Sequence, residues 1–261
     1  MMRFLLLLVF VVFSSHEFWL QPEKFMYKRG EAINIRFLVG ENFEGANWKG
    51  NKDKIQSLDL YYGGVKANIA DHVSQAAGDS IQLNIFDEGN ALIAFNSTNS
   101  FIELEPKKFR EYLVEDGLQT ALTYRQEHQE TDSIGREYYQ RCSKTLLQIG
   151  TATNAVFKTP TTLPLDIIPQ SNPYLVKDGD SLKAVVYFQK KPLASTLVKV
   201  WHRAGGQTTQ KDLITDDKGM VVFPVMANGQ WMISSVQMIR LQNDPKADWQ
   251  SYWGSFVWGY Q

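Results

Sequence analysis

The chain lacks the cysteines that many exported proteins use for stability. It has 261 residues and a single cysteine, Cys142, so no disulfide can form within it. A chain of this length can instead bury a large hydrophobic core. Cys142 follows Ile134 and Tyr138 at intervals of four residues, which is the spacing of one helix face. We therefore expect Cys142 to be a buried structural thiol and not a nucleophile.

The sequence also lacks an excess of charge and the usual enzyme motifs. Its formal net charge is −1, which gives no basic face for nucleic acid or an anionic membrane. It contains no glycine-rich phosphate loop, nucleophile elbow, paired-histidine zinc helix or calcium loop. Four histidines and one cysteine leave few residues from which to build a catalytic triad. We therefore predict a binding protein that is not an enzyme.

Long hydrophobic runs are absent except at the N-terminus. Residues 4–13 are all apolar and follow Arg3, but ten residues of helix reach only about 15 Å, roughly half of a bilayer core. The small residues Ser14 and Ser15 come next. This arrangement predicts a signal peptide over residues 1–15, cleaved after Ser14 or Ser15, and a mature periplasmic protein without membrane insertion.

Apolar and polar residues alternate in several short segments that follow the N-terminal run. The segments are 33–37, 58–60, 81–85 and 102–104. Such alternation is typical of strands with one buried face. The pair Gly63-Gly64 indicates a turn after the second segment. We expect a β-rich N-terminal domain over residues 16–160.

The period changes between residues 106 and 149. Pro106 suits the first turn of a helix, and apolar residues then recur at spacings of three and four. A third helical stretch is predicted over 134–147, so the whole segment reads as a helical insertion. On that third helix Arg141 and Lys144 are expected to form a salt-bridged seam that docks the insertion, with an anion or partner site as the alternative.

Four prolines, at positions 160, 164, 169 and 173, predict a rigid linker. Beyond it, strands are expected at 181–188, 196–201, 220–225 and 230–239. The aromatic segment 249–260 is expected to be a closing strand covered on both sides. Short strands and turns over about 100 residues favour an immunoglobulin-like sandwich at 165–261. The predicted fold is mainly β, with two β-sandwich modules and a helical insertion.

His16 is the candidate metal ligand. Cleavage after Ser15 would leave its imidazole and the new α-amine to chelate one ion, and a second histidine would complete a copper or nickel site. Cleavage after Ser14 would offer an amine, a deprotonated amide and the imidazole in one plane, which suits Ni²⁺ or Cu²⁺. The alternative is that His16 only begins the first strand. His72, His128 and His202 are expected to be solvated.

Several segments together resemble an uncharacterised bacterial family. They are residues 16–22, 109–113, 117–118, 136–144, 163–169, 172–174, 229–232 and 248–253. The family is a domain of unknown function that is often labelled the periplasmic component of a cobalt/nickel ABC-type transport system. The resemblance covers nearly the whole mature chain.

The resemblance implies an exported protein with a histidine at or next to the mature N-terminus, a role in handling Ni²⁺ or Co²⁺, and a membrane metal transporter as partner. Members often carry a histidine before the residue that is Met238 here, whereas this chain has Gln237. That departure removes a second metal ligand. The leading hypothesis is a periplasmic protein that binds or delivers nickel, cobalt or copper. The alternative is a metal-free periplasmic binding or assembly module.

Overall fold

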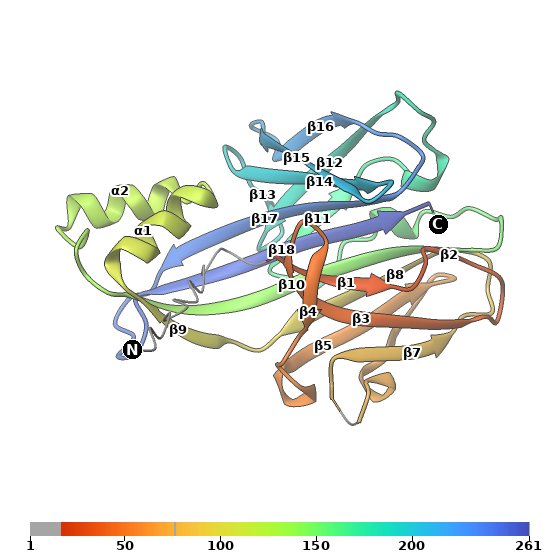
Figure 1. Ribbon diagram of the computed structural model, residues 1–261, viewed down its shortest axis with the longest axis horizontal. Coiled ribbons are helices and arrows are strands. Elements are labelled where there is room, and N and C mark those ends of the chain that lie inside the picture. The colour runs from red at the N-terminus through yellow and green to blue at the C-terminus, as the bar shows by residue number, and fades with distance from the viewer. Residues whose placement is uncertain (1–16, 76, 261) are drawn as a thin grey trace, which may run out of the picture.

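A computed structural model describes residues 17–75 and 77–260 of the chain. The fold is mainly β, as predicted, and its strands form one long central sheet between two smaller sheets (Figure 1). Two α-helices lie together at one end of the long strands: α1 (Pro106–Glu115) and α2 (Gln119–Glu127). The other helices within the described residues are single 3-10 turns: η1 (Lys52–Lys54), η2 (Ala70–His72), η3 (Val156–Lys158) and η4 (Pro173–Leu175).

The central sheet has ten strands and contains strands from both halves of the chain. Along the sheet they are β15 (Gln207–Ile214), β14 (Leu197–Ala204), β17 (Gln230–Arg240), β18 (Trp249–Gly259), β10 (Gly135–Ile149), β8 (Gly89–Ser97), β5 (Ile55–Tyr62) and β6 (Val65–Asn68), with β2 (Met26–Tyr27) and β9 (Ser100–Leu104) also paired to β10. The two halves meet where β10 and β18 pair in parallel, from Glu137 opposite Trp249 to Thr145 opposite Val257.

Each face of the central sheet is covered by one smaller sheet. One consists of β1 (Glu17–Pro22), β3 (Ala32–Glu41), β4 (Glu44–Asn47) and β7 (Ser80–Asn84); the other consists of β11 (Leu165–Pro169), β12 (Ser181–Phe188), β13 (Lys191–Pro192) and β16 (Met220–Pro224). In β8, Ile93 and Phe95 enter the first core, whereas Leu92 and Ala94 enter the second. This alternation follows from the pleat, which sends successive side chains to opposite faces.

The helix pair covers the end of the central sheet that the smaller sheets leave open. Phe109 and Leu113 of α1 and Ala121 of α2 are buried against Met238 and Trp249 of the long strands. Pro106 stands in the first turn of α1, as the sequence predicts. Among the residues that the structure describes, no helix is long and apolar enough to cross a membrane.

The prediction of a third helix over 134–147 is wrong, because this segment is the strand β10. The helices therefore end near residue 127, and the helical insertion is much shorter than 106–149. Strand β10 lies between β18 and β8 and is covered on both faces, so its sequence shows no alternation. Arg141 and Lys144 have opposite parity on this strand and point to opposite faces, so they form no common seam.

The other predicted elements are largely confirmed. The four alternating segments of the N-terminal half fall in β3, β5, β7 and β9, and those of the C-terminal half fall in β12, β14, β16 and β17. The segment 249–260 contains β18, which is covered on both sides. Cys142 is buried, and burial raises the pKa of its thiol to about 12. The division into two domains stays a prediction; the central sheet takes strands from both sides of the proline-rich segment.

Candidate functional site

The candidate ligand His16 and the predicted signal peptide lie outside the described residues. The described chain starts at Glu17, the residue bonded to His16 and the first residue of β1. Neighbouring Cα atoms across a trans peptide are about 3.8 Å apart. The surroundings of Glu17 are therefore the described part of any site that uses His16.

Glu17 is a carboxyl group in an unusually buried position, only 4% exposed. The chain places it there because β1 pairs with β3, and β1 also contacts β10 and β18. Burial raises the pKa of Glu17 to about 7; nearby Lys199 opposes the shift, and Asp116 adds to it. Glu17 therefore changes its charge near neutral pH.

Lys199 connects this region to the helices. Its Nζ donates a hydrogen bond to Oδ1 of Asp116, the C-terminal cap of α1, at 2.7 Å. Both side chains are nearly inaccessible to solvent. Burial alone would lower the pKa of Lys199, but Asp116 and Glu17 together raise it, so the ammonium stays charged. The pair ties the end of α1 to strand β14 of the central sheet.

A second buried carboxyl group, Glu137, lies in the same region on β10. Its Oε1 accepts hydrogen bonds from the hydroxyls of Tyr112 and Ser251. Its Oε2 has no hydrogen-bond partner among the described residues. Burial raises the pKa of Glu137 to about 7, an effect that the two hydroxyls oppose and Asp116 reinforces. Glu137 is thus a second buried carboxyl group with a pKa raised to about 7, and its contact with Tyr112 places it beneath α1.

A cavity of about 190 Å³ adjoins Glu17. Its lining residues are Glu17, Glu41, Asn42, Glu115, Lys199, Trp201, Gln210 and Asp212. Four of them are carboxylic acids and one is a lysine, so the cavity favours a cation. Carboxylate and imidazole together suit divalent transition metals. Within residues 17–75 and 77–260, however, no three His, Cys, Asp or Glu side chains converge as metal ligands, so a complete site here would need His16.

The structure shows where Gln237 and the other histidines considered in the sequence analysis lie. Gln237 lies on β17 three residues after Ser234, which hydrogen-bonds Glu17. The two side chains therefore point to opposite faces of the strand, so a histidine at 237 would not approach Glu17. His72 and His128 are exposed, as expected.

The expectation that His202 is solvated is wrong. It is only 9% exposed, and its ring stacks on Trp231 with the ring centroids 4.0 Å apart. Its Nε2 lies 3.0 Å from Oδ1 of Asn228. His202 lies inside β14 directly opposite Trp231 of β17, and this cross-strand pairing explains its burial.

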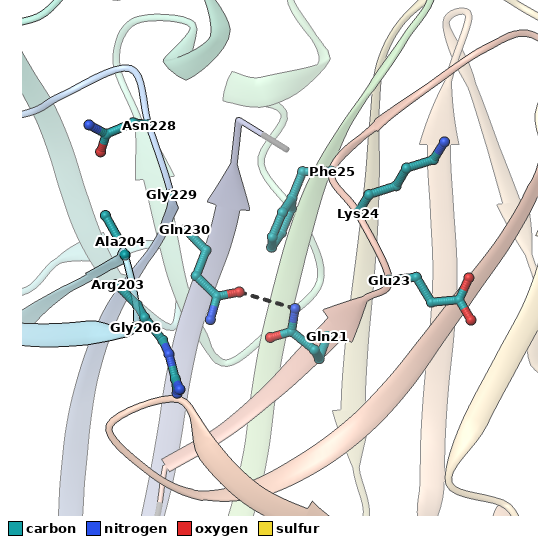
Figure 2. A pocket seen from close by; sticks show the side chains of 11 residues that line it. Gln21, Glu23, Lys24, Phe25, Arg203, Ala204, Gly206, Asn228, Gly229 and Gln230 are labelled. Atoms are coloured by element: carbon teal, nitrogen blue, oxygen red, sulfur yellow. Dashed lines mark hydrogen bonds between the residues drawn. The ribbon is translucent and has the colours of Figure 1, made fainter.

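A larger cavity of about 520 Å³ lies at the other end of β1 (Figure 2). Gln21 and Gln230 join across it, with Gln21 Nε2 donating to Gln230 Oε1 at 3.1 Å. Phe25 and the glycine-containing turns around Gly206 and Gly229 form its walls. No sequence pattern pointed to this cavity. Its lining mixes amides with charges of both signs and shows no preference for one ligand class.

Sequence reasoning missed the buried charges around Glu17. A signal was present, because Glu17 directly precedes the apolar run 18–20 and Lys199 stands between Val198 and Val200. A charged residue enclosed by apolar neighbours in a strand points to a buried, paired charge. The partner of Lys199 is Asp116, which lies 83 positions away in the sequence, so no local pattern could show this pairing.

Comparison with known proteins gives the family. The model of a domain of unknown function, DUF4198, matches residues 13–238, and the chain belongs to this family. No curated protein matches the chain. Among solved structures, a DUF4785 family protein from Legionella pneumophila aligns over 82% of this chain and 50% of its own, with 8% identity and a TM-score of 0.25. This chain thus spans half the length of that protein.

Two further solved structures align with equally low identity and TM-score. Bovine butyrophilin aligns over 92% of this chain and 98% of its own, with 9% identity and a TM-score of 0.22. A Salmonella alpha-2-macroglobulin aligns over 94% of this chain and 15% of its own, with 10% identity and a TM-score of 0.24.

Proposed function

We propose that the mature chain is a periplasmic binding protein that takes up Ni²⁺, Co²⁺ or Cu²⁺ through His16 and delivers the ion to a membrane transporter. One observation carries the proposal. The residue bonded to His16 lies at a cavity with four carboxylic acids in its lining. The metal is the cargo of the protein, so its site must both bind and release it.

Two groups of ligand atoms would bind the metal ion. Signal cleavage after Ser15 would supply the α-amine and the imidazole of His16, and Glu41 and Asp212 would supply carboxylate oxygens from the cavity wall. Glu17 faces Lys199 and is buried, so its role is to hold the end of β1 in place. This arrangement does not require a histidine at position 237.

The test is metal binding by protein exported with its natural N-terminus. Equilibrium dialysis against Ni²⁺, Co²⁺ and Cu²⁺ should give about one ion per chain for at least one metal. His16→Ala should abolish binding. Loss of a supporting carboxylate in Glu41→Gln or Asp212→Asn should weaken it about 10- to 100-fold.

Glu23→Gln is the matched control, because Glu23 lines the other cavity. It should bind metal as the wild type does. N-terminal sequencing of the periplasmic protein checks the cleavage site. Absence of metal binding by the correctly cleaved protein would leave the metal-free binding or assembly module as the better hypothesis.

A further inference from the structure

Lys144 and Asp166 face each other inside the second core in an arrangement unlike an ordinary ion pair. Lys144 comes from β10 and Asp166 from β11, and their side chains are 0% and 6% exposed. Lys144 Nζ lies 2.5 Å from Asp166 Oδ1. Among the described residues, neither atom makes a hydrogen bond of acceptable geometry. The buried pair Lys199 and Asp116, in contrast, makes a regular hydrogen bond.

The surroundings of this pair do not support two separate charges. An ammonium group has three donors to satisfy, and the ring of Phe256 lies 5.5 Å from Lys144 Nζ. Burial lowers the pKa of Lys144, although Asp166 opposes the shift. Removing two charges from water costs more than one poorly directed contact returns. Loss of a proton from Lys144, which leaves a neutral amine, relieves the cost of burying the ammonium.

The carboxyl group of Asp166 is held in a fixed orientation. Its Oδ2 accepts hydrogen bonds from the Thr161 backbone N–H at 2.8 Å and from the Thr161 hydroxyl at 2.9 Å. The same hydroxyl accepts from the N–H of Leu163 at 3.3 Å, so its own proton points to Asp166. Two donors on one carboxyl oxygen stabilise the negative charge that develops there during acyl transfer. Oδ1 is left facing the amine.

We propose that Lys144 and Asp166 form an intramolecular amide cross-link. The lone pair of neutral Nζ attacks Cγ of the protonated carboxyl group, and charge develops on Oδ2 beside Thr161. The bond between Cγ and Oδ1 then breaks, and Oδ1 leaves as water with its own proton and one proton from Nζ. The product amide keeps one N–H and Oδ2 as its carbonyl oxygen. No oxidant or other reactant is consumed.

The cross-link would join the central sheet to β11 and close the chain between residues 144 and 166. Closing a loop covalently restricts the unfolded chain, as a disulfide does. This protein cannot make a disulfide of its own, because Cys142 is its only cysteine. The amide would also remove the unsatisfied Oδ1 of Asp166 from the core and leave the Lys144 nitrogen with one N–H in place of three.

Intact mass under denaturing conditions tests the proposal directly. The wild-type protein should be lighter than its mature sequence by one water molecule, whereas Lys144→Met and Asp166→Ala should each have the full mass of their own mature sequence. Lys199→Met is the matched control, because it removes the other buried lysine of a Lys–Asp pair and should keep the deficit. A wild-type protein of full sequence mass overturns the cross-link.

Peptide mapping locates the bond. Trypsin should fail to cut after Lys144 and should release a branched peptide that contains Asp166. Thr161→Val keeps both reacting groups but removes the hydroxyl donor, so freshly made protein should show a mixture of linked and unlinked mass. A water deficit that maps elsewhere, or that persists in Lys144→Met, also contradicts the proposal.

Discussion

The hydroxyl of Tyr112 donates a hydrogen bond to Oε1 of Glu137 at 3.2 Å, and both side chains are buried. This contact joins α1 to β10. The second carboxyl oxygen, Oε2, has no hydrogen-bond partner among the described residues. A buried carboxylate with one unsatisfied oxygen is costly, and this cost is why burial raises the pKa of Glu137 to about 7.

The raised pKa predicts a specific pH dependence of stability. The folded state holds the Glu137 proton more tightly than the unfolded state, whose carboxyl has its ordinary value near 4.5. The stabilising contribution is therefore complete below pH 4.5 and is lost as pH rises toward 7. Glu137→Gln mimics the protonated form, so it should be more stable than wild type at pH 8, by up to about 3 kcal/mol.

Urea unfolding at pH 5 and pH 8 measures this difference. The advantage of Glu137→Gln should be small at pH 5 and larger at pH 8. Some pH dependence should remain in the variant, because the pKa of Glu17 is raised in the same way. Glu103→Gln, on the neighbouring strand β9, is the control and should show no such change. Equal stability differences at both pH values would contradict the assignment.

Lys199 provides a second test of the buried charges. Lys199→Met removes the ammonium group that donates a hydrogen bond to the buried Asp116. Removing one partner of a buried pair typically costs about 3–5 kcal/mol because the other charge stays buried. The double variant Lys199→Met with Asp116→Asn should recover much of this loss in urea unfolding. If the double variant is no more stable than the single one, the pair is not the source of the effect.

Whether a strand could be predicted from the sequence depended on whether one or both of its faces are buried. The alternating segments 33–37 and 81–85 have one buried face and were recognised as strands. The segment 135–149 is covered on both faces, so its apolar residues follow no two-residue period, and a spacing of four suggested a helix. The aromatic segment 249–260 is also covered on both faces, but its density of large rings was recognisable. The charges around Glu17 depend on long-range pairing and could not be placed.

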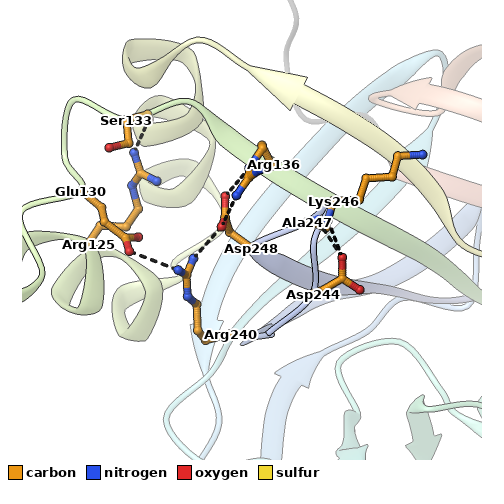
Figure 3. A network of polar contacts seen from close by, with 9 residues as sticks. All are labelled: Arg125, Glu130, Ser133, Arg136, Arg240, Asp244, Lys246, Ala247 and Asp248. Carbon is orange, nitrogen blue, oxygen red and sulfur yellow. Dashed lines mark hydrogen bonds and ion pairs between the residues drawn. The ribbon is translucent and has the colours of Figure 1, made fainter. Parts of the chain in front are cut away.

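Arg240 is expected to hold the helix pair on the long strands (Figure 3). It contacts Glu130 at 3.1 Å and Asp248 at 3.5 Å, and its guanidinium lies over the rings of Tyr124 and Trp249. Arg240→Ala should therefore speed amide hydrogen exchange across α2 with little change in β10 or β18. The global stability should fall by only about 1 kcal/mol, because the site is partly exposed.

Arg203→Ala is the control for Arg240→Ala. Arg203 also makes several polar contacts, but these join β14 to the turn after β3. Its loss should leave hydrogen exchange in α2 unchanged. Unchanged exchange in α2 for Arg240→Ala would show that the apolar contacts alone hold the helices.

Cys142 should be unreactive in the folded protein. It is 1% exposed, and burial raises the pKa of its thiol to about 12, so the reactive thiolate is scarce at pH 8. A neutral maleimide should label it only after unfolding in urea, which mass spectrometry can follow. Rapid labelling of the native protein would mean that the strand β10 opens far more often than its burial suggests.

The parallel pairing of β10 with β18 predicts that the two halves of the chain fold together. Nine residues of each strand are in register, and the first core contains Trp201, Met232 and Val257 from the C-terminal half. A fragment of residues 16–160 would expose one edge of β10 and lose these side chains from its core. It should therefore be unfolded by circular dichroism and amide exchange, whereas the whole chain should unfold in one transition by both measurements. A fragment with native-like spectra and cooperative unfolding would show instead that the N-terminal half is an independent domain.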